Sequence, residues 1–381
     1  MTKVTIVGCG VVGATIAYEL SRIPDLQVTV LDRQPPAQAA TGAALGVLMG
    51  AISQKTKGRA WLMRQASLQR YETLIPELVA TTGQAIPWNR QGIVLLCFEP
   101  DSRSRWQSLV DLRRSQGWEL ELWTAEQVRS HCPQLDPPRL ALAVYSPHDR
   151  QVDPTALTLA LVQAAQKNGV VFHFDCEVTG FECAQQDTDA GQTCHHILTT
   201  TQSIATDWVV VSAGLGSTPL TETAKHPIPI RPVLGQALEV QLDHPLGHAQ
   251  FQPVITGEDV HIVPLMGNHS ERRYWIGATV EFPATVDTDE IAANSDRLQE
   301  IWQAAMAFCP ALQHATICKT WSGLRPRPSD RAAPVIERLN RYRNVLVATG
   351  HYRNGVLLAP ATALAIRETI LGGAKEGIEE T

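Results

Sequence analysis

The sequence contains no excess of basic residues. Its 32 Lys and Arg residues are outnumbered by 38 Asp and Glu residues, which leaves a formal charge of -6 at pH 7. A chain of this charge offers no cationic field to attract a phosphate backbone, so nucleic acid is not the expected partner. The composition favours a small-molecule substrate.

Long apolar runs are also missing from the sequence. No stretch of about 18 consecutive apolar residues occurs, and the first predicted strand begins near Lys3, which leaves no room for a secretory signal before it. The sequence therefore predicts a soluble, cytoplasmic protein without an integral membrane segment.

The cysteines lack the spacing of a metal site or a disulfide framework. There are eight and they form no CxxC pair: Cys9, Cys97, Cys132, Cys176, Cys183, Cys194, Cys309 and Cys318. Scattered cysteines of this kind are typical of reduced thiols in a cytosolic protein, so we expect no bound metal.

The amino-terminal region does carry a clear pattern of secondary structure. Residues Lys3–Val7 are a short β-branched run, which is typical of a buried parallel strand. Apolar residues at helical spacing then predict a helix through Arg22, and Gln27–Leu31 is a second strand. Together they predict one βαβ unit.

A glycine-rich turn with GxGxxG spacing, Gly8-Cys9-Gly10-Val11-Val12-Gly13, joins the first strand to the helix. The first glycine permits a tight turn, the second lets the backbone approach a pyrophosphate, and the third lets helix and strand pack closely. Asp32 ends the second strand, where its carboxylate can bind ribose hydroxyls. The pattern predicts a dinucleotide cofactor but does not separate FAD from NAD.

The rest of the chain predicts two domains. With 381 residues, 44% of them hydrophobic, it is long enough for two cores. We assign residues 1–85, 150–225 and 320–381 to a discontinuous Rossmann-like α/β domain that binds the dinucleotide. Residues 86–149 and 226–319 are assigned to an α+β substrate domain with a mostly antiparallel sheet.

Periodicity predicts further helices and strands in both domains. The helices are expected over residues 59–78, 102–116, 154–167, 291–308 and 360–371. The strands are expected over residues 92–98, 170–174, 208–214, 236–241, 260–264, 274–278 and 344–349.

Two carboxyl-terminal motifs are long enough to be specific. They are Trp321-Ser322-Gly323-Leu324-Arg325-Pro326 and Gly350-His351-Tyr352-Arg353-Asn354-Gly355-Val356-Leu357-Leu358-Ala359-Pro360. They resemble the WAGLRP and GHxRNGxLLAP motifs of the glycine oxidase and D-amino acid oxidase family of flavoenzymes. Residues 41–48, 152–154 and 232–236 are similar to other segments of that family, so the resemblance covers nearly the whole chain.

The resemblance implies that the cofactor is FAD, which we expect to bind non-covalently. Its expected contacts come from the glycine turn, the acidic strand end, the small-residue segment after it and three later loops. They are Gly8, Gly10, Val11, Val12, Gly13, Asp32, Arg33, Thr41, Ala43, Ala44, Gly46, Val47, Leu48, Val178, Ala213, Gly214, Arg325, His351, Tyr352, Arg353, Asn354, Gly355, Val356 and Leu357.

The resemblance also implies catalytic residues. Arg325 matches the arginine that anchors the substrate carboxylate, and a guanidinium can bind a carboxylate through two parallel hydrogen bonds. Arg353 is expected to be a flavin-side or second anion contact, with a structural salt bridge as the alternative. His351 is equally compatible with a hydrogen-bonded core position.

The expected substrate pocket departs from the family pattern. His261 stands where glycine oxidases carry a tyrosine near the substrate carboxylate. Met49 is expected in the pocket, and Val47 and Val280 fall where well-known members have methionines. These departures leave the preferred substrate size open.

The activity that the resemblance implies is FAD-dependent oxidative deamination of a small amino acid. Glycine is the first choice, followed by sarcosine and small D-amino acids, with oxygen giving hydrogen peroxide; family members are often homo-oligomers. In that family, glycine oxidation supplies the imine for the thiazole ring of thiamine. The alternatives are a D-amino acid or proline-type dehydrogenase that reduces a quinone or other acceptor, an NAD-dependent dehydrogenase, and a non-catalytic flavin-binding module.

Overall fold

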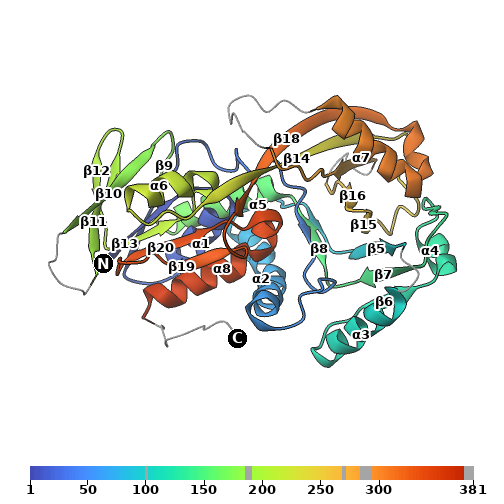
Figure 1. Cartoon of the computed structure of the whole chain (residues 1–381), viewed down its shortest axis with the longest axis horizontal. Helices are drawn as coiled ribbons and strands as arrows, with labels where there is room; N and C mark the ends of the chain where they lie inside the picture. The colour runs from blue at the N-terminus through green and yellow to red at the C-terminus, as the bar shows by residue number, and fades with distance from the viewer. Residues whose placement is uncertain (99–101, 185–190, 268–271, 284–293, 373–381) are drawn as a thin grey trace.

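Two large sheets form the framework of the molecule. The computed structural model describes residues 1–98, 102–184, 191–267, 272–283 and 294–372. Figure 1 shows the two sheets toward opposite ends of the longest axis, with the strands β14 (Ile230–Gln241) and β18 (Thr316–Pro328) running between them.

The first sheet has six strands and begins with the predicted βαβ unit. Its pairs are parallel except at the edge strand β19. In spatial order the strands are β19 (Val335–Arg338), β20 (Val345–Thr349), β13 (Trp208–Val211), β1 (Thr2–Val7), β2 (Leu26–Leu31) and β9 (Val171–His173). The central strands β1, β13 and β20 are mostly buried, as their apolar sequences require when both faces of a sheet are covered.

Different elements cover the two faces of this sheet. The helices α1 (Val11–Ser21), α2 (Gly58–Thr82), α5 (Pro154–Lys167) and α8 (Gly355–Ile370) pack together in one apolar cluster. A second cluster joins the other face to α6 (Ser217–Thr223) and to a small sheet of β10 (Val178–Ala184), β11 (Thr193–Thr199) and β12 (Ser203–Ala205).

The second large sheet has eight strands and carries the expected antiparallel pattern. Among the described strands, only the β5–β15 pair of this sheet is parallel. Its order is β18, β14, β17 (Arg273–Gly277), β16 (Val260–Pro264), β15 (Val254–Gly257), β5 (Ile93–Cys97), β7 (Leu142–Ser146) and β6 (Glu121–Trp123). The associated helices are α3 (Ser102–Ser115), α4 (Ala125–His131), α7 (Ser295–Phe308) and η2 (Pro310–His314).

A third, short sheet lies between the two large ones. It consists of β3 (Val47–Leu48), β8 (Arg150–Val152) and β4 (Trp88–Asn89). Two further short helices, η1 (Gly214–Gly216) and η3 (Tyr352–Asn354), follow β13 and β20 of the first sheet. These connecting segments contain many of the predicted site residues.

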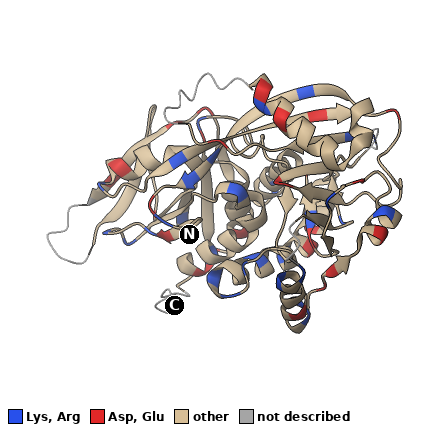
Figure 2. Ribbon diagram, turned by 45° about the vertical axis from the view of Figure 1, so that its right-hand side comes forward, with Lys and Arg blue, Asp and Glu red and all other residues tan. Residues whose placement is uncertain are grey.

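Charged residues of both signs are spread over the two halves of the molecule (Figure 2). Glu19 on α1 is a charged residue that is buried. Its carboxylate lies 2.8 Å from Arg70 of α2 and 3.8 Å from Arg367 of α8. These ion pairs connect three helices of the first domain. Within the described ranges, the helices fall short of the length and apolarity that a membrane crossing requires.

The last helix begins earlier than its sequence predicts. A helix starting at Pro360 was expected, but α8 begins at Gly355 and contains Pro360. Proline removes the hydrogen bond to the carbonyl four residues before it. That carbonyl, of Val356, instead accepts a hydrogen bond from the Tyr71 hydroxyl at 2.5 Å, and Ser67 Oγ accepts the N–H of Ala361.

The other predicted elements lie within a few residues of the observed ones. The first residues of the helix expected over 291–308 lie outside the described part of the chain, and α7 begins at Ser295. The strand β18 crosses the domain boundary predicted at residue 320, because the whole strand pairs with β14. The two-domain α/β fold is confirmed, and the domain limits remain a prediction.

Candidate functional site

Two of the glycines in the GxGxxG turn are fixed by close packing. A Cβ atom on Gly8 would lie 2.6 Å from the backbone oxygen of Ser212, and Gly8 also has a φ of +104°. A Cβ on Gly13 would lie 1.9 Å from the oxygen of Gly8. Only glycine therefore lets β1, β13 and α1 approach as they do.

The turn presents the amino terminus of α1. Gly10, the N-cap residue, provides no side-chain cap, and the N–H of Val11 donates to Thr41 Oγ1 at 3.0 Å. Val12 and Gly13 follow in the first helical turn, whose N–H groups have no partners within the helix. The positive end of the helix dipole adds to this arrangement, which suits a phosphate anion.

Asp32 lies beside the same turn at the end of β2. Its carboxylate accepts the N–H of Cys9 at 2.5 Å and the N–H of Gln34 at 3.0 Å. Burial raises the pKa of Asp32, while the hydrogen bonds from Cys9 and Gln34 lower it. Each carboxylate oxygen keeps a further lone pair that can accept a ribose hydroxyl.

Two more predicted contacts flank Asp32. Arg33 follows it with an exposed side chain. The N–H of Cys176 donates to the carbonyl of Asp32, which brings the segment leading to Val178 against the end of β2. Val178 begins β10 and is half-buried.

The small-residue segment after β2 packs backbone against backbone. A Cβ on Gly46 would lie 1.7 Å from the oxygen of Val152 in β8, and the φ of Gly46 is +70°. Ala43 connects the segment to β18, because its carbonyl accepts the indole N–H of Trp321 at 3.1 Å. Ala44 is half-buried, and Leu48 is fully buried in β3.

Gln151 is a buried residue in this region that sequence reasoning missed. It pairs with Val47 in the β3–β8 ladder, and its amide nitrogen donates to the carbonyl of Leu45 at 3.3 Å. Its side-chain oxygen is buried without a hydrogen-bond partner among the described residues. A buried acceptor of this kind requires a donor. The only sequence signal was its place directly before the Val152-Asp153-Pro154 motif.

The glycine turn, the small-residue segment and the unpartnered Gln151 oxygen together fit a bound dinucleotide with a ring system. The turn accommodates phosphate, Asp32 accommodates ribose, and the segment next to Gln151 has the small side chains that a flat ring needs for close approach. The residues present therefore fit FAD.

Asp149 and Arg113 hold the segment that follows β3, and neither was predicted. The fully buried carboxylate of Asp149 accepts the N–H groups of Gly50, Ala51 and Ile52 at 2.7–2.9 Å. The Arg113 guanidinium donates to three carbonyls of the same segment and stacks on Trp61 at 3.5 Å. Burial lowers the pKa of Arg113 to about 10, and Asp149 opposes that shift. No sequence motif marks these contacts of Asp149 and Arg113.

The carboxyl-terminal motif forms the loop between β20 and α8. Gly350 has a φ of +66°, and a Cβ there would lie 2.7 Å from Pro328 of β18. Thr349, just before it, donates to the carbonyl of Gly214 at 3.2 Å, which places Ala213 and Gly214 beside this loop. Two predicted FAD segments thus meet here: Ala213–Gly214, and the loop that leads into α8 at Asn354, Gly355, Val356 and Leu357.

His351 and Tyr352 occupy different surroundings in this loop. The His351 ring is buried, with Nε2 2.9 Å from Thr362 Oγ1, and burial, followed by the charge of Arg59, lowers its pKa to about 3. Its ring is thus engaged with α8, as in the core alternative. Tyr352 is half-buried, has a φ of +54°, and lies under the guanidinium of Arg327.

Arg325 lies on β18 with its guanidinium over the backbone of Gly235. A Cβ on Gly235 would be 2.2 Å from Arg325 Nη2, so the glycine makes room for the side chain. Nη1 donates to the carbonyls of Leu234 at 3.2 Å and Thr279 at 3.0 Å. Burial and then the charge of Arg353 lower the pKa of Arg325. Within the described residues, no carboxylate lies at ion-pairing distance from this guanidinium.

His261 and Arg353 share the electrostatic environment of Arg325. The half-buried His261 has Nδ1 2.9 Å from Thr256 Oγ1. Burial lowers its pKa to about 4, and the charges of Arg353 and Arg325 contribute to this shift. The charge of Asp259 acts in the opposite direction. Arg353 lies 3.5 Å from Asp259, and both side chains are exposed. The structure thus brings the three predicted catalytic residues together.

An apolar wall stands near these residues. Val47, Met49, Trp275, Ala278 and Trp321 are partly buried and belong to one cluster, in which the two tryptophan rings meet edge to face at 5.8 Å. Val280 is half-buried and follows Thr279, whose carbonyl binds Arg325. The predicted pocket residues therefore come from β3, from the segment after it and from the segment after β17.

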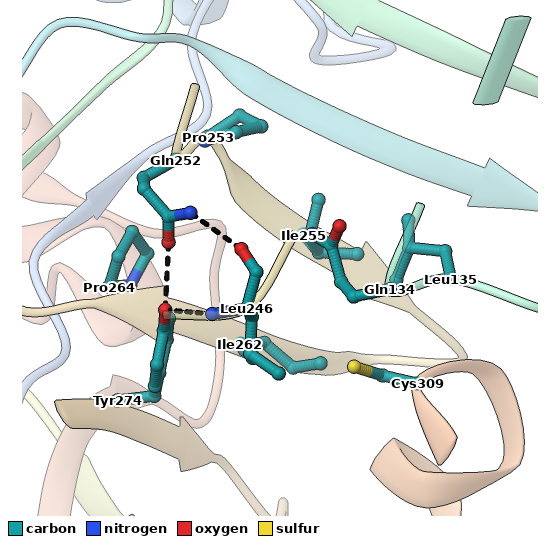
Figure 3. A pocket seen from close by; sticks show the side chains of 10 residues that line it. All are labelled: Gln134, Leu135, Leu246, Gln252, Pro253, Ile255, Ile262, Pro264, Tyr274 and Cys309. Atoms are coloured by element: carbon teal, nitrogen blue, oxygen red, sulfur yellow. Dashed lines mark hydrogen bonds between the residues drawn. The ribbon is translucent and has the colours of Figure 1, made fainter. Parts of the chain in front are cut away.

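Two hollows in the molecule contain none of the predicted site residues. One is a cavity of about 10 Å³ in the eight-stranded sheet, where Tyr274, Gln252 and Leu246 are linked by hydrogen bonds (Figure 3). Its size suits a single water, and the Gln134 side-chain oxygen on its wall is buried without a partner among the described residues. The other, of about 460 Å³, is an open groove beside α2 and β4.

Comparison with known proteins gives matches over nearly the whole chain. The family model described as DAO, FAD dependent oxidoreductase, matches residues 3–369. The chain is 27% identical over 367 residues to a glycine oxidase of Geobacillus kaustophilus, covering 96% of this chain and 92% of that protein. It is 32% identical over 376 residues to the bifunctional protein ThiO/ThiG of Synechocystis sp., covering 97% of this chain and 52% of that protein.

Solved structures agree with the sequence matches. The crystal structure of glycine oxidase from Geobacillus kaustophilus is similar with a TM-score of 0.84 at 27% identity, covering 100% of this chain and 97% of that one. That of glycine oxidase from Bacillus cereus gives 0.83 at 25% identity and covers 100% of both chains. The chain spans about half the length of its ThiO/ThiG relatives.

Proposed function

This chain belongs to the DAO family of FAD-dependent oxidoreductases, and we propose that it catalyses the oxidative deamination of glycine or another small amino acid. Family membership makes it an FAD-dependent amino acid oxidoreductase, which decides against an NAD enzyme and a non-catalytic flavin module. Sarcosine and small D-amino acids are the next candidate substrates. The products are the imine or oxo acid, ammonia and, with oxygen, hydrogen peroxide.

The observation that supports this proposal is the burial of Arg325 and the kind of hydrogen-bond partners it has. Its guanidinium is largely buried, yet the partners of Nη1 are two neutral backbone carbonyls. A buried cation without a carboxylate partner is costly, and a carboxylate ligand with fork geometry compensates for that cost. An α-amino acid supplies such a carboxylate.

FAD, when bound, accepts the hydride from the substrate Cα, and the protein supplies position and charge. Arg325 binds the substrate carboxylate. His261 stays neutral at physiological pH because its pKa is near 4, so it acts as a hydrogen-bonding group rather than a second cation. Val47, Met49 and Val280 are the residues that we expect to line the space for the substrate side chain.

Replacement of Arg325 by alanine tests the proposal. Loss of a charge-assisted carboxylate contact costs about 1.5–3 kcal/mol, so kcat/KM should fall roughly 10- to 150-fold. Steady-state kinetics with glycine, sarcosine and D-alanine measure this loss, and flavin absorbance of the purified variant confirms that FAD is still bound.

Two variants serve as controls for the arginine test. Arg325→Lys should rescue only in part, because an ammonium lacks the fork. Arg231→Ala changes an exposed arginine on the neighbouring strand β14 and should alter kcat/KM far less. Wild-type kcat/KM in Arg325→Ala would contradict the proposed role.

The electron acceptor and the substrate are separated by two further measurements. Anaerobic bleaching of the flavin by glycine, sarcosine, D-alanine, D-proline and L-proline ranks the substrates. Peroxide formation under air, compared with dye reduction under nitrogen, distinguishes an oxidase from a dehydrogenase that uses a quinone or other acceptor. Fast dye reduction with negligible peroxide would contradict the oxidase proposal.

We place this reaction in the cytoplasm and in the supply of an imine for the thiazole ring of thiamine. The similarity to proteins named glycine oxidase and ThiO/ThiG supports the second point. Non-covalent FAD and a homo-oligomeric state complete the proposal, and both follow from the family resemblance.

A further inference from the structure

Two cysteines far from the amino acid site face each other across a β ladder. In the small sheet beside the first domain, Cys183 of β10 is the direct register partner of Cys194 of β11. Opposite residues of antiparallel strands have Cα atoms about 4.5–5.5 Å apart, and disulfides span about 4.4–6.8 Å. The register pairing, next to a bulge between Glu182 and Cys183, therefore brings the two cysteines to the spacing of a cross-strand disulfide.

We propose that Cys183 and Cys194 form an oxidation site at which a peroxide converts the two thiols to a disulfide. Both residues are free thiols in the structure. The site lies on β10 and β11, outside the sheets that carry Arg325 and the glycine turn. It is separate from the amino acid oxidation chemistry.

The surroundings of the two sulfur atoms differ and assign them different roles. The neighbouring Cys194 thiol and Tyr342 hydroxyl lower the pKa of the half-buried Cys183 to about 7, against burial and the charge of Glu182. Cys194 is fully buried, and the neighbouring Cys183 together with burial raises its pKa. Cys183 is therefore the accessible nucleophile, and Cys194 is the resolving thiol.

The position of Cys194 is fixed by its backbone contacts. The N–H of Cys194 donates to Asn344 Oδ1 at 2.9 Å, and Asn344 Nδ2 donates to the Cys194 carbonyl at 2.7 Å. Cys194 Sγ also donates to the carbonyl of His196 at 3.3 Å. Since Asn344 directly precedes β20, these bonds hold β11 against the first large sheet and keep the resolving thiol beside Cys183.

The chemistry balances with hydrogen peroxide as the oxidant. The Cys183 thiolate attacks one peroxide oxygen, the O–O bond breaks, and a sulfenic acid and hydroxide form. The Cys194 sulfur then attacks the Cys183 sulfur, the S–S bond forms, and the sulfenic oxygen leaves as water. Two thiols and one peroxide thus give one disulfide and two waters.

Other cysteines of the chain lack this combination. Burial raises the pKa values of Cys132 and Cys309 to about 12 and also raises that of Cys9. Cys318 is exposed, and its Sγ donates to the carbonyl of Thr316. Selective oxidation at Cys183 and Cys194 is therefore expected.

The test is to treat the fully reduced holoenzyme with hydrogen peroxide, block remaining thiols by alkylation, and map the product by mass spectrometry. Cleavage before Asp187 or Asp189 separates the two cysteines, so a disulfide keeps the two peptides linked until reduction. We expect this linked species and a thiol titre that falls by two from the eight cysteines. Oxidation confined to Cys318, or a linkage between other cysteines, would overturn the proposal.

Variants examine the roles of the individual groups. Cys183→Ser and Cys194→Ser should each abolish the linked species, whereas Cys176→Ser, a buried cysteine nearby, should retain it. The Tyr342→Phe variant keeps both thiols but lacks the hydroxyl that helps to lower the pKa of Cys183, so at pH 7 its reaction should be several-fold slower, and its rate should rise at higher pH. An unchanged pH–rate profile in this variant would contradict the role of Cys183 as the activated thiol.

The source of the peroxide rests on the proposed oxidase function, and the experiment separates the two. Added peroxide tests the cysteine pair without turnover. Glycine turnover under air, with and without catalase, then tests whether the enzyme supplies its own oxidant. A disulfide formed only with added peroxide would count against the oxidase activity, whereas peroxide production without the disulfide would count against the cysteine pair.

Discussion

The glycine-rich turn packs the backbone of one short motif together, whereas the surroundings of Arg325 are built from segments that are distant in sequence. At Gly13 a methyl group would lie 1.9 Å from a carbonyl oxygen within the same short motif. Around Arg325, the groups in contact or in electrostatic range come from β14, β16, η3 and the end of β17. The glycine turn thus depends on a few consecutive residues, and the surroundings of Arg325 depend on how whole elements are placed.

The largest effect is expected from a methyl group in the turn. Gly13→Ala places a Cβ against the Gly8 oxygen and the Ser212 hydroxyl, so β1, β13 and α1 must move apart. We expect a loss of more than about 4 kcal/mol in the free energy of unfolding, or failure to fold, together with loss of bound flavin. Flavin absorbance and urea unfolding measure both effects.

Gly180→Ala is the matched control for this change. A Cβ there would be 3.8 Å from Thr223 Oγ1, an ordinary contact, and Gly180 has no positive φ. This variant should stay within about 1 kcal/mol of the wild type and keep its flavin. Equal behaviour of the two variants would show that the turn tolerates side chains and would remove the contrast between the two regions.

A smaller loss is expected from Asp149, which supports the segment between the two regions. Asp149→Ala leaves three buried N–H groups without their acceptor and deprives Arg113 of a nearby charge. We expect about 3 kcal/mol of destabilisation, measured by urea unfolding, and slower turnover, because Val47 and Met49 lie next to the released segment.

Asp153→Ala provides the comparison for Asp149. Asp153 is the N-cap of α5 and accepts one N–H, from Ala156. Its loss should cost about 1 kcal/mol, as is usual for an N-cap. If the Asp149→Ala variant were no less stable than the Asp153→Ala variant, the buried hydrogen bonds of Asp149 would have no special role in stability.

The smallest effect concerns pH and His351. Its pKa is about 3 in the folded protein and near 6.5 when unfolded, so the unfolded state binds more protons between these values. Stability therefore falls as the pH drops below 6.5. Between pH 8 and pH 5, the His351→Gln variant should lose up to about 2 kcal/mol less of its unfolding free energy than the wild type does. At pH 8 the two proteins should be similarly stable. Urea unfolding at both pH values measures the difference. An equal change in unfolding free energy between pH 8 and pH 5 in the variant and the wild type would contradict the prediction.

The same contrast explains which features the sequence could predict. The βαβ unit, the glycine turn and Asp32 follow from local rules, because spacing within about 30 residues determines them. Gln151, Asp149 and Arg113 carry no local signature, since their importance arises from partners that are distant in sequence. Arg325, His261 and Arg353 were reached only through family motifs, and the structure brings them into one electrostatic environment.

Helix α8 shows how tertiary contacts can override a local rule. Pro360 suggested a helix start, but the hydroxyl groups of Tyr71 and Ser67 on α2 satisfy the carbonyl and the N–H next to the proline. With those groups satisfied, the helix extends back to Gly355. The proline position alone could not reveal partners that lie almost 300 residues earlier in the chain.

The ribbon of β14 and β18 has a mechanical consequence. Its ladder runs from Ile230–Pro328, beside the FAD loops, to Gln241–Thr316, beside α7, and its only irregularity among the described pairs is at Glu239 and Val240 (Figure 1). A continuous ladder of two hydrogen-bonded strands connects the two halves of the molecule here, in place of a flexible single-chain linker, so we expect the two halves to move little relative to each other. For the proposed oxidase, we then expect substrate exchange to depend on local movement of loops and side chains around Arg325.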